Sequence, residues 1–242
     1  MFKVLRNSLL SLIYPQECRV CSRHVENVDD GVACARCWGK TRIFDGGQML
    51  CAKCGAFFND SDIKIDVFCH KCDDHLYDKA VAVGIYEKAL ASTVVNLKTV
   101  PKISRNVAAS FVKAFETSSF LETTVIMPIP LSRRRRLERG FNQAEILCEI
   151  LGRSTGIAID RHSLIRKHHS PIHRVAMDKK ARELTVKNAF EVRRPKLIDG
   201  QNILLVDDVF TSGATSSYCA KVLKRSGANA VNVLTLARAV SD

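Results

Sequence analysis

One run of thirteen residues constrains the fold of this chain more than any other segment. Residues 203–215 read Ile-Leu-Leu-Val-Asp-Asp-Val-Phe-Thr-Ser-Gly-Ala-Thr. The four apolar residues at its start predict a buried strand, because a central parallel strand is covered on both faces. Two acids follow where that strand is expected to end. A small-residue loop at 211–215 then leads into a segment with the apolar spacing of a helix.

This arrangement predicts a site for a phosphate next to a polyol. The first N–H groups of a helix lack intrahelical partners, and the helix dipole favours negative charge there. Asp207 and Asp208 would repel a phosphate, but they suit the hydroxyls of a sugar or a metal-bound sugar beside it. A ribose phosphate is therefore suggested, and an ordinary strand, loop and helix with surface acids is the alternative. The chain has no P-loop motif, and Gly213 alone does not make a dinucleotide fingerprint.

Eight of the ten cysteines form four C-x-x-C pairs. The pairs are Cys18/Cys21, Cys34/Cys37, Cys51/Cys54 and Cys69/Cys72. Two pairs at this spacing can complete one tetrahedral zinc site, so the sequence predicts two structural four-cysteine sites. Disulfides are the competing explanation, but C-x-x-C repeats are the usual zinc arrangement inside cells. Pairing in chain order is favoured, and a cross-brace stays open. Cys148 and Cys219 lie in helix-like segments and are expected to be inert buried thiols.

The net charge of +12 is concentrated in the larger part of the chain. We predict an N-terminal helix and double zinc-ribbon module at residues 1–78, and a larger domain at 79–242. The first contains 10 basic and 11 acidic residues, and the second contains 27 and 14. Anion attraction therefore belongs to the larger domain. The apolar stretch at 2–13 is too short to span a membrane and lacks a cleavage site, so we expect a cytoplasmic protein without a membrane span.

Strand and helix patterns alternate from residue 80 onward, which predicts an α/β fold with a largely parallel sheet flanked by helices. Strands are expected at 80–86, 124–127, 203–206 and 230–236, and helices at 89–98, 107–115, 141–151 and after Thr215. Ligands of such sheets bind beyond the carboxyl ends of the strands.

The segment at 128–143 is expected to be a loop at that same edge of the sheet. It is rich in arginine, and Arg139 beside Gly140 is predicted to hold a pyrophosphate, whose several charges need more than one cation. The residues at 133–136 are either further pyrophosphate contacts or a solvated charge run. Asn142 followed by Glu145 resembles a capping box for the next helix.

The run at 203–215 resembles the 5-phosphoribosyl-1-pyrophosphate (PRPP) signature of the type I phosphoribosyltransferases. The resemblance implies that Asp207 and Asp208 face the ribose hydroxyls. It also implies that the 5-phosphate is wrapped by Thr211, Ser212, Gly213, Ala214 and Thr215. With the four C-x-x-C pairs and a Pro-x-Pro before Glu-Arg-Gly-Phe-Asn-Gln, the whole chain resembles the ComF family. One departure is Thr185, which stands where that family tends to carry Asn.

Three functions stay open at this point. In the first, PRPP bound with Mg²⁺ loses pyrophosphate while a nitrogen nucleophile attacks C1, and Asp207, Asp208 and Arg139 are the catalytic residues. In the second, the resemblance to the ComF family implies a role in DNA uptake with helicase-like or recombination proteins, and the basic domain holds single-stranded DNA. In the third, PRPP regulates DNA binding without turnover. The histidine-rich stretch at 162–173 is interpreted as a flap or a nucleic-acid surface.

Overall fold

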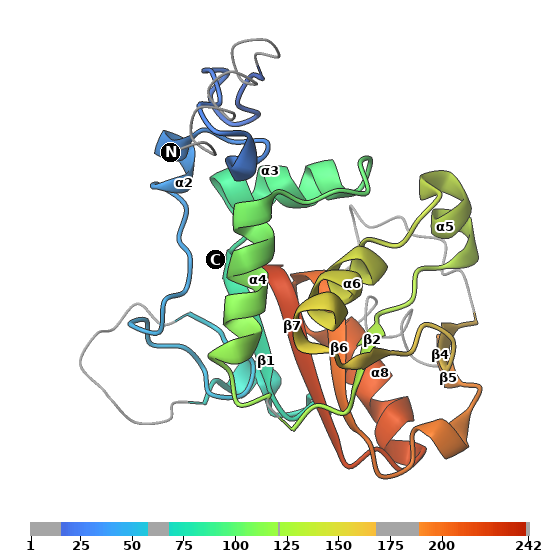
Figure 1. The fold of residues 1–242 in the computed structure, drawn as a ribbon. Helices are drawn as coiled ribbons and strands as arrows, with labels where there is room; N and C mark the ends of the chain where they lie inside the picture. The colour runs from blue at the N-terminus through green and yellow to red at the C-terminus, as the bar shows by residue number, and fades with distance from the viewer. Residues whose placement is uncertain (1–15, 58–67, 121, 168–188, 241–242) are drawn as a thin grey trace, which may run out of the picture.

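The computed structural model describes residues 16–57, 68–120, 122–167 and 189–240 (Figure 1). Its main sheet has five parallel strands in the order β1-β7-β6-β2-β3. These strands are β1 (Ala80–Ile85), β2 (Val125–Pro128), β3 (Ala158–Ile159), β6 (Asn202–Phe210) and β7 (Ala230–Arg238). A separate antiparallel ribbon pairs β4 (Leu164–Arg166) with β5 (Phe190–Val192). The predicted parallel α/β sheet is confirmed.

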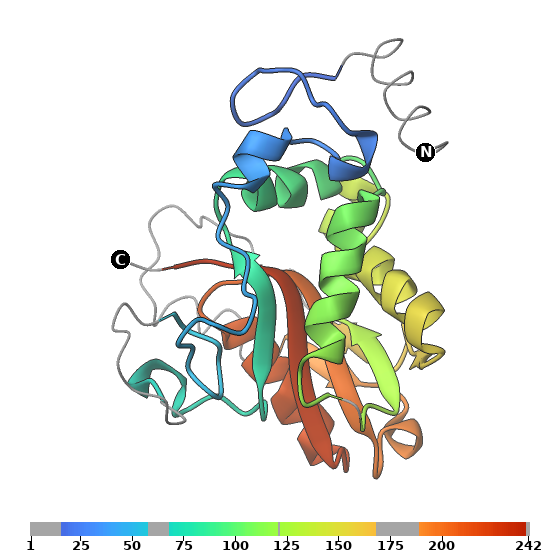
Figure 2. The ribbon, with the colours of Figure 1, turned by 60° about the vertical axis from the view of Figure 1, so that its left-hand side comes forward.

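Helices cover both faces of the sheet, because alternate residues of β6 enter different cores. Ile203 and Leu205 pack in the core that contains α8 (Ala214–Arg225). Leu204 and Val206 enter the opposite core, and all four side chains are fully buried. That second core is formed with α3 (Lys88–Leu97), α4 (Arg105–Glu116) and α6 (Gln143–Thr155). Figures 1 and 2 show α8 on one side of the sheet and α4 and α6 on the other. Burial on both faces explains the unbroken apolar run.

β6 is longer than the sequence predicts. The predicted strand ended at Val206, but pairing with β7 continues to Phe210, which lies opposite Arg238. The two acids therefore lie within the strand, because hydrogen bonding to a long neighbour outweighs the low strand preference of aspartate. The connecting loop is reduced to residues 211–213, and Ala214 is already the first residue of α8.

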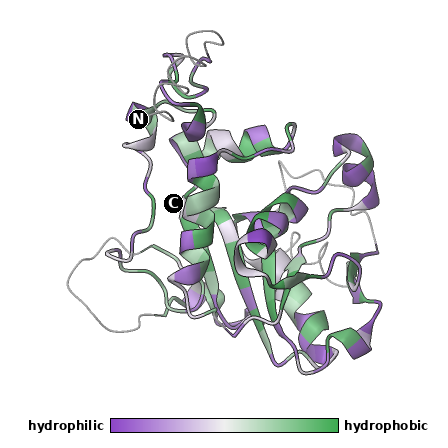
Figure 3. Ribbon diagram, in the orientation of Figure 1, coloured by the Kyte–Doolittle hydropathy of each residue, from purple (hydrophilic) through white to green (hydrophobic). Residues whose placement is uncertain are grey.

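The arginine-rich segment is not a continuous loop, contrary to the prediction. It contains helix α5 (Arg133–Arg139), whose surface is strongly hydrophilic (Figure 3). Ser132 caps the first turn, and Gly140 ends the helix in the left-handed region with φ 76°. Arg134 and Glu138 form an ion pair one turn apart, at 2.6 Å. The cap and the ion pair offset the repulsion within the run of arginines.

The remaining elements are short and belong mostly to the cysteine-containing segment. They are η1 (Val28–Asp30), α2 (Ala35–Trp38), η2 (His70–Cys72) and η3 (Pro195–Leu197). The predicted N-terminal helix lies outside the described residues, and so does the stretch 168–188, which contains Thr185 and three of the four histidines of 162–173. Within the described parts of the chain, no helix has the length and apolarity needed to cross a bilayer. The division into 1–78 and 79–242 stays a prediction.

Candidate functional site: two cysteine centres and the carboxyl edge of the sheet

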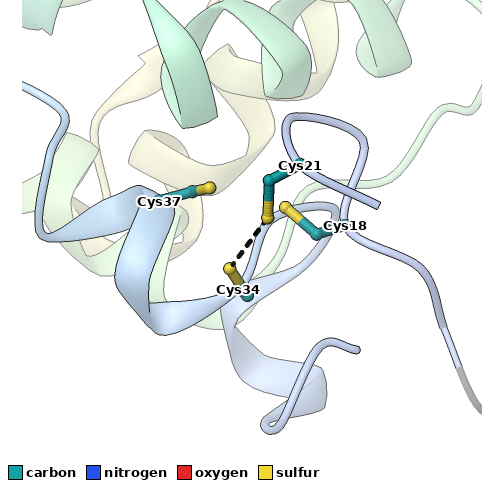
Figure 4. A group of neighbouring side chains, drawn as sticks. All are labelled: Cys18, Cys21, Cys34 and Cys37. Atoms are coloured by element: carbon teal, nitrogen blue, oxygen red, sulfur yellow. Dashed lines mark hydrogen bonds between the residues drawn. The ribbon is translucent and has the colours of Figure 1, made fainter. Parts of the chain in front are cut away.

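The eight paired cysteines gather into two groups in chain order. Cys18, Cys21, Cys34 and Cys37 form the first site, and Cys51, Cys54, Cys69 and Cys72 form the second. Within each group all four sulfur atoms lie within 4.8 Å of one another. Figure 4 shows the four side chains of the first site turned toward a common centre. The predicted pairing of neighbouring C-x-x-C turns is confirmed.

The spacing of the sulfur atoms fits zinc. Cys21 Sγ lies 3.7 Å from Cys34 Sγ, and Cys51 Sγ lies 3.6 Å from Cys72 Sγ. A tetrahedron with Zn–S bonds of about 2.3 Å has edges of about 3.8 Å, whereas a disulfide bond is about 2.05 Å long. All ten cysteines are free. The two four-cysteine centres therefore have the geometry of structural zinc-ribbon sites.

The clustered thiols also favour binding of a cation, because their thiolate forms repel one another. Burial and the neighbouring thiols, chiefly Cys21, raise the pKa of Cys37 to about 12. Four thiolates therefore coexist in this space only when a metal ion balances their charge. Cys148 and Cys219 stand apart from both sites, are fully buried, and have a raised pKa because of that burial. Their prediction as buried thiols is confirmed.

The two acids of the sequence signature lie side by side near the end of β6. The backbone N–H of Asp208 donates to Asp207 Oδ1 at 2.9 Å. Burial, and then the nearby carboxylate of Asp208, raise the pKa of Asp207 well above its usual range. Hydroxyl donors or a cation next to this pair would relieve the repulsion and favour the ionised form.

The loop at 211–213 connects β6 to α8. Gly213 is the N-cap residue of this helix, has φ 76°, and offers no side chain to cap the first turn. Thr211 and Ser212 are exposed, and Ser212 Oγ accepts from the N–H of Ala214 at 3.4 Å. The first turn of a twelve-residue helix thus meets a solvent-exposed loop of small residues.

The arginine-rich segment begins beside the acids, as predicted. Pro128, the last residue of β2, lies opposite Val206, the residue before Asp207. The predicted pyrophosphate residue Arg139 is half-buried in the last turn of α5. Its role stays a prediction.

The cap of α6 differs from a complete capping box. Asn142 accepts from the N–H of Ala144 at 3.1 Å, as an N-cap residue does. The carboxylate of Glu145, however, pairs with Arg136 at 2.6 Å. Glu145 therefore joins α5 to α6.

A cavity of about 670 Å³ lies between α5, the end of β2 and the β4–β5 ribbon. Arg133, Arg166 and Arg193 line it, and among the described residues none of the three has an acidic partner. The other basic residues of the lining are paired: Arg136 with Glu145, Arg161 with Glu149 and Lys167 with Glu191. The cavity therefore carries unbalanced positive charge.

Arg166 is the most constrained of these cations. Its guanidinium lies over the ring of buried Phe190, 5.3 Å from the centroid. Its Nε is buried and has no hydrogen-bond acceptor within the described chain. Burial and the nearby Arg135 lower the pKa of Arg166. Sequence reasoning missed Arg166 and Arg193, because only the pairing of two short, distant strands brings them to one cavity.

Comparisons with known proteins agree with both halves of this architecture. A model of the double zinc ribbon domain matches residues 9–74. The DNA utilization protein YhgH of Escherichia coli strain K12 is 29% identical over 213 residues, covering 85% of this chain and 89% of the relative. Competence protein ComFC of Bacillus subtilis strain 168 is 28% identical over 224 residues, covering 86% and 85%.

Among solved structures, a glutamine PRPP amidotransferase from B. subtilis aligns with 61% of this chain and 26% of its own. Its TM-score is 0.37 and its sequence identity is 16%. The sequence relatives are more informative, because they match 85% and 86% of this chain. The chain is therefore similar, over most of its length, to relatives named for competence and DNA utilization, and it carries a double zinc ribbon.

Proposed function

We propose that the chain binds PRPP together with Mg²⁺ at the carboxyl edge of β6. One observation carries this proposal: only Val209, Phe210 and a loop of three residues, 211–213, separate the acid pair from the first turn of α8. The hydroxyls of a ribose can then reach Asp207 and Asp208 while its 5-phosphate meets the backbone N–H groups of the helix. Thr211 and Ser212 would add hydroxyl donors to the phosphate, Gly213 would complete the loop, and Ala214 and Thr215 would contribute from the start of α8.

In a transfer reaction, the bond from C1 of the ribose to pyrophosphate breaks and a bond from C1 to an acceptor nitrogen forms. The acceptor nitrogen loses a proton in the process. Asp207 and Asp208 would orient the sugar, and Arg133 and Arg139 are candidates to stabilise the departing pyrophosphate. Mg²⁺, when bound, would neutralise part of the pyrophosphate charge. The acceptor is the unassigned part of this proposal.

The acid pair provides the direct test of PRPP binding. Asp207→Asn/Asp208→Asn is expected to weaken PRPP binding in the presence of Mg²⁺ by at least about tenfold, because two charged hydrogen-bond acceptors are lost. Isothermal titration measures the change. Glu116→Gln, on the exposed surface of α4, is the matched control and should leave the affinity unchanged.

Unchanged affinity in the double variant, or no PRPP binding by the natural chain, would contradict the proposal. Turnover is a separate question, which pyrophosphate release across a panel of bases and nucleotides answers, with and without single-stranded DNA. Release that requires both PRPP and an acceptor establishes transfer. Binding without release leaves PRPP as a regulatory ligand.

The second candidate function is binding of single-stranded DNA, and the basic cavity favours it. The relatives are named for DNA utilization and for competence, so we propose that this chain also acts in DNA uptake or use. Arg133, Arg166 and Arg193 form an unbalanced cluster suited to phosphate groups. Helicase-like or recombination proteins would be its partners in that setting.

Arg166→Met/Arg193→Met tests this second function. The double variant is expected to weaken binding of a single-stranded oligonucleotide and to reduce the slope of log affinity against log salt by roughly 1 to 2. Fluorescence anisotropy at several salt concentrations measures both quantities. Arg153→Met, on an exposed part of α6 outside the cavity, is the control. An equal loss in the control, or a slope that does not change, would place DNA binding elsewhere.

A further inference from the structure

The segment that follows the second cysteine site lies against the loop between β6 and α8. A Cβ atom placed on Gly213 would come within 2.7 Å of Cε1 of His75 and 2.6 Å of Cζ of Phe210. The imidazole and the phenyl ring therefore touch the backbone of Gly213 directly. His75 thus packs against the loop although it lies more than a hundred positions earlier in the chain.

His75 is held from the cysteine side. The side chain of Lys53, which lies inside the Cys51–Cys54 turn, donates to the carbonyl of His75 at 2.7 Å. The N–H of His75 donates to the carbonyl of Cys72 at 3.0 Å. Both C-x-x-C turns of the second site therefore hold the backbone of His75.

The same segment reaches α8 and a buried tyrosine. The N–H of Leu76 donates to Ser217 Oγ, in the first turn of α8, at 3.0 Å. His75 Nδ1 shares a hydrogen bond with the hydroxyl of Tyr77, whose side chain is 1% exposed. This bond fixes the orientation of the imidazole against Gly213.

A second route joins the cysteine site to the end of β6. Arg238, at the end of β7, donates to the carbonyl of Cys54 and lies 3.5 Å from its sulfur. The same guanidinium lies over the ring of Phe210, 4.7 Å from the centroid. Tyr77 meets that ring edge-on at 5.8 Å. Phe210 immediately precedes the loop, so its position sets where the loop begins.

Among the described residues, the first cysteine site packs against α3 and not against the β6–α8 loop. Its core contains Val25, Ala33 and Ala89, the last of these from α3. In Figures 1 and 2, residues 18–38 lie over α3, apart from residues 50–57 of the second site. Each site offers four cysteine ligands, but the two sites pack against different parts of the fold.

We infer that the second cysteine site, acting through His75 and Phe210, positions the β6–α8 loop for its ligand, whereas the first site does not. His75 is a positioning residue in this account. The expected change in ligand affinity rests on the proposed binding of PRPP, whereas the expected ordering of the loop does not. Metal at the second site and affinity at the loop are therefore coupled.

Single cysteine variants of the two sites provide a matched comparison in the full-length chain. Cys69→Ser in the second site and Cys21→Ser in the first should each lower the metal content. Only Cys69→Ser should accelerate hydrogen exchange in peptides covering 211–217, and weaken PRPP binding by about tenfold or more. Equal effects from both variants, or no effect from Cys69→Ser, would overturn the inference.

His75→Ala keeps the test decisive if the cysteine variant does not fold. It removes no metal ligand, so both metal equivalents should remain while loop exchange accelerates and PRPP affinity falls about tenfold. His75→Gln, which can keep the bond to Tyr77, should recover part of the loss. Normal exchange in His75→Ala would refute the role of His75. Absence of PRPP binding in the natural chain would refute the proposed function alone, since the exchange comparison needs no ligand.

Discussion

Replacing Gly213 by alanine is expected to destabilise the protein by about 2–4 kcal/mol and to abolish measurable PRPP binding. The backbone at Gly213 has φ 76°, which costs an alanine about 1 kcal/mol or more. The added Cβ would also stand 2.6 Å from Phe210 and 2.7 Å from His75, closer than real contacts allow. These groups cannot retreat cheaply, because each is fixed by further contacts with Tyr77.

Gly140→Ala separates the two contributions. Gly140 has the same φ of 76°, but a Cβ added there would have no other atom within 4 Å among the described residues. This variant should therefore lose only the backbone part, about 1 kcal/mol. Urea unfolding and isothermal titration of both variants measure the difference. Equal losses of stability would mean that the His75 and Phe210 contacts with the loop do not constrain it.

Metal removal should also lower the stability of the folded protein by a large amount. Structural zinc sites in small modules contribute on the order of 10 kcal/mol at neutral pH, and here the first cysteine group has only a small core of its own. The natural chain is expected to contain two zinc equivalents. A chelator should expose all eight paired thiols to alkylation while Cys148 and Cys219, buried in the sheet cores, stay unreactive until global unfolding.

Metal affinity should also fall as the pH falls. Protons compete with zinc for thiols such as Cys37, whose metal-free pKa is raised to about 12 by burial and neighbouring thiols. Zinc content measured after dialysis over a pH series tests the direction. Cys148→Ala and Cys219→Ala should keep two equivalents. Fewer than two in the natural chain would mean that one cysteine group does not bind zinc.

The sequence was sufficient to predict the elements and their order, since the apolar runs and C-x-x-C spacings are local signals. Two of its predictions were wrong, one because a neighbouring strand decides the outcome and one because local side-chain interactions do. The acids near Val206 predicted the end of a strand, yet pairing with β7 extends β6 to Phe210. The run of arginines predicted a loop, yet the cap at Ser132 and an i,i+4 ion pair make a helix.

Contacts between distant segments were also beyond sequence reasoning. No local pattern relates His75 to Gly213, or Arg238 to Cys54, because only the folded sheet brings them together. The cavity arginines Arg166 and Arg193 belong to the same category. The acid pair and the small loop were identified in advance because they are contiguous in the chain.

The pairing of β1 with β7 has a consequence for the order of assembly. Ala80 lies opposite Val233, so the first and the last of the described strands are neighbours in the sheet. Such a contact closes a long loop and raises the contact order, which slows folding. During synthesis, the cysteine turns are complete long before β7 leaves the ribosome, and Arg238 comes with β7. The nascent chain can therefore acquire its metal early, while the ligand edge of the sheet is finished only when β7 inserts between β1 and β6.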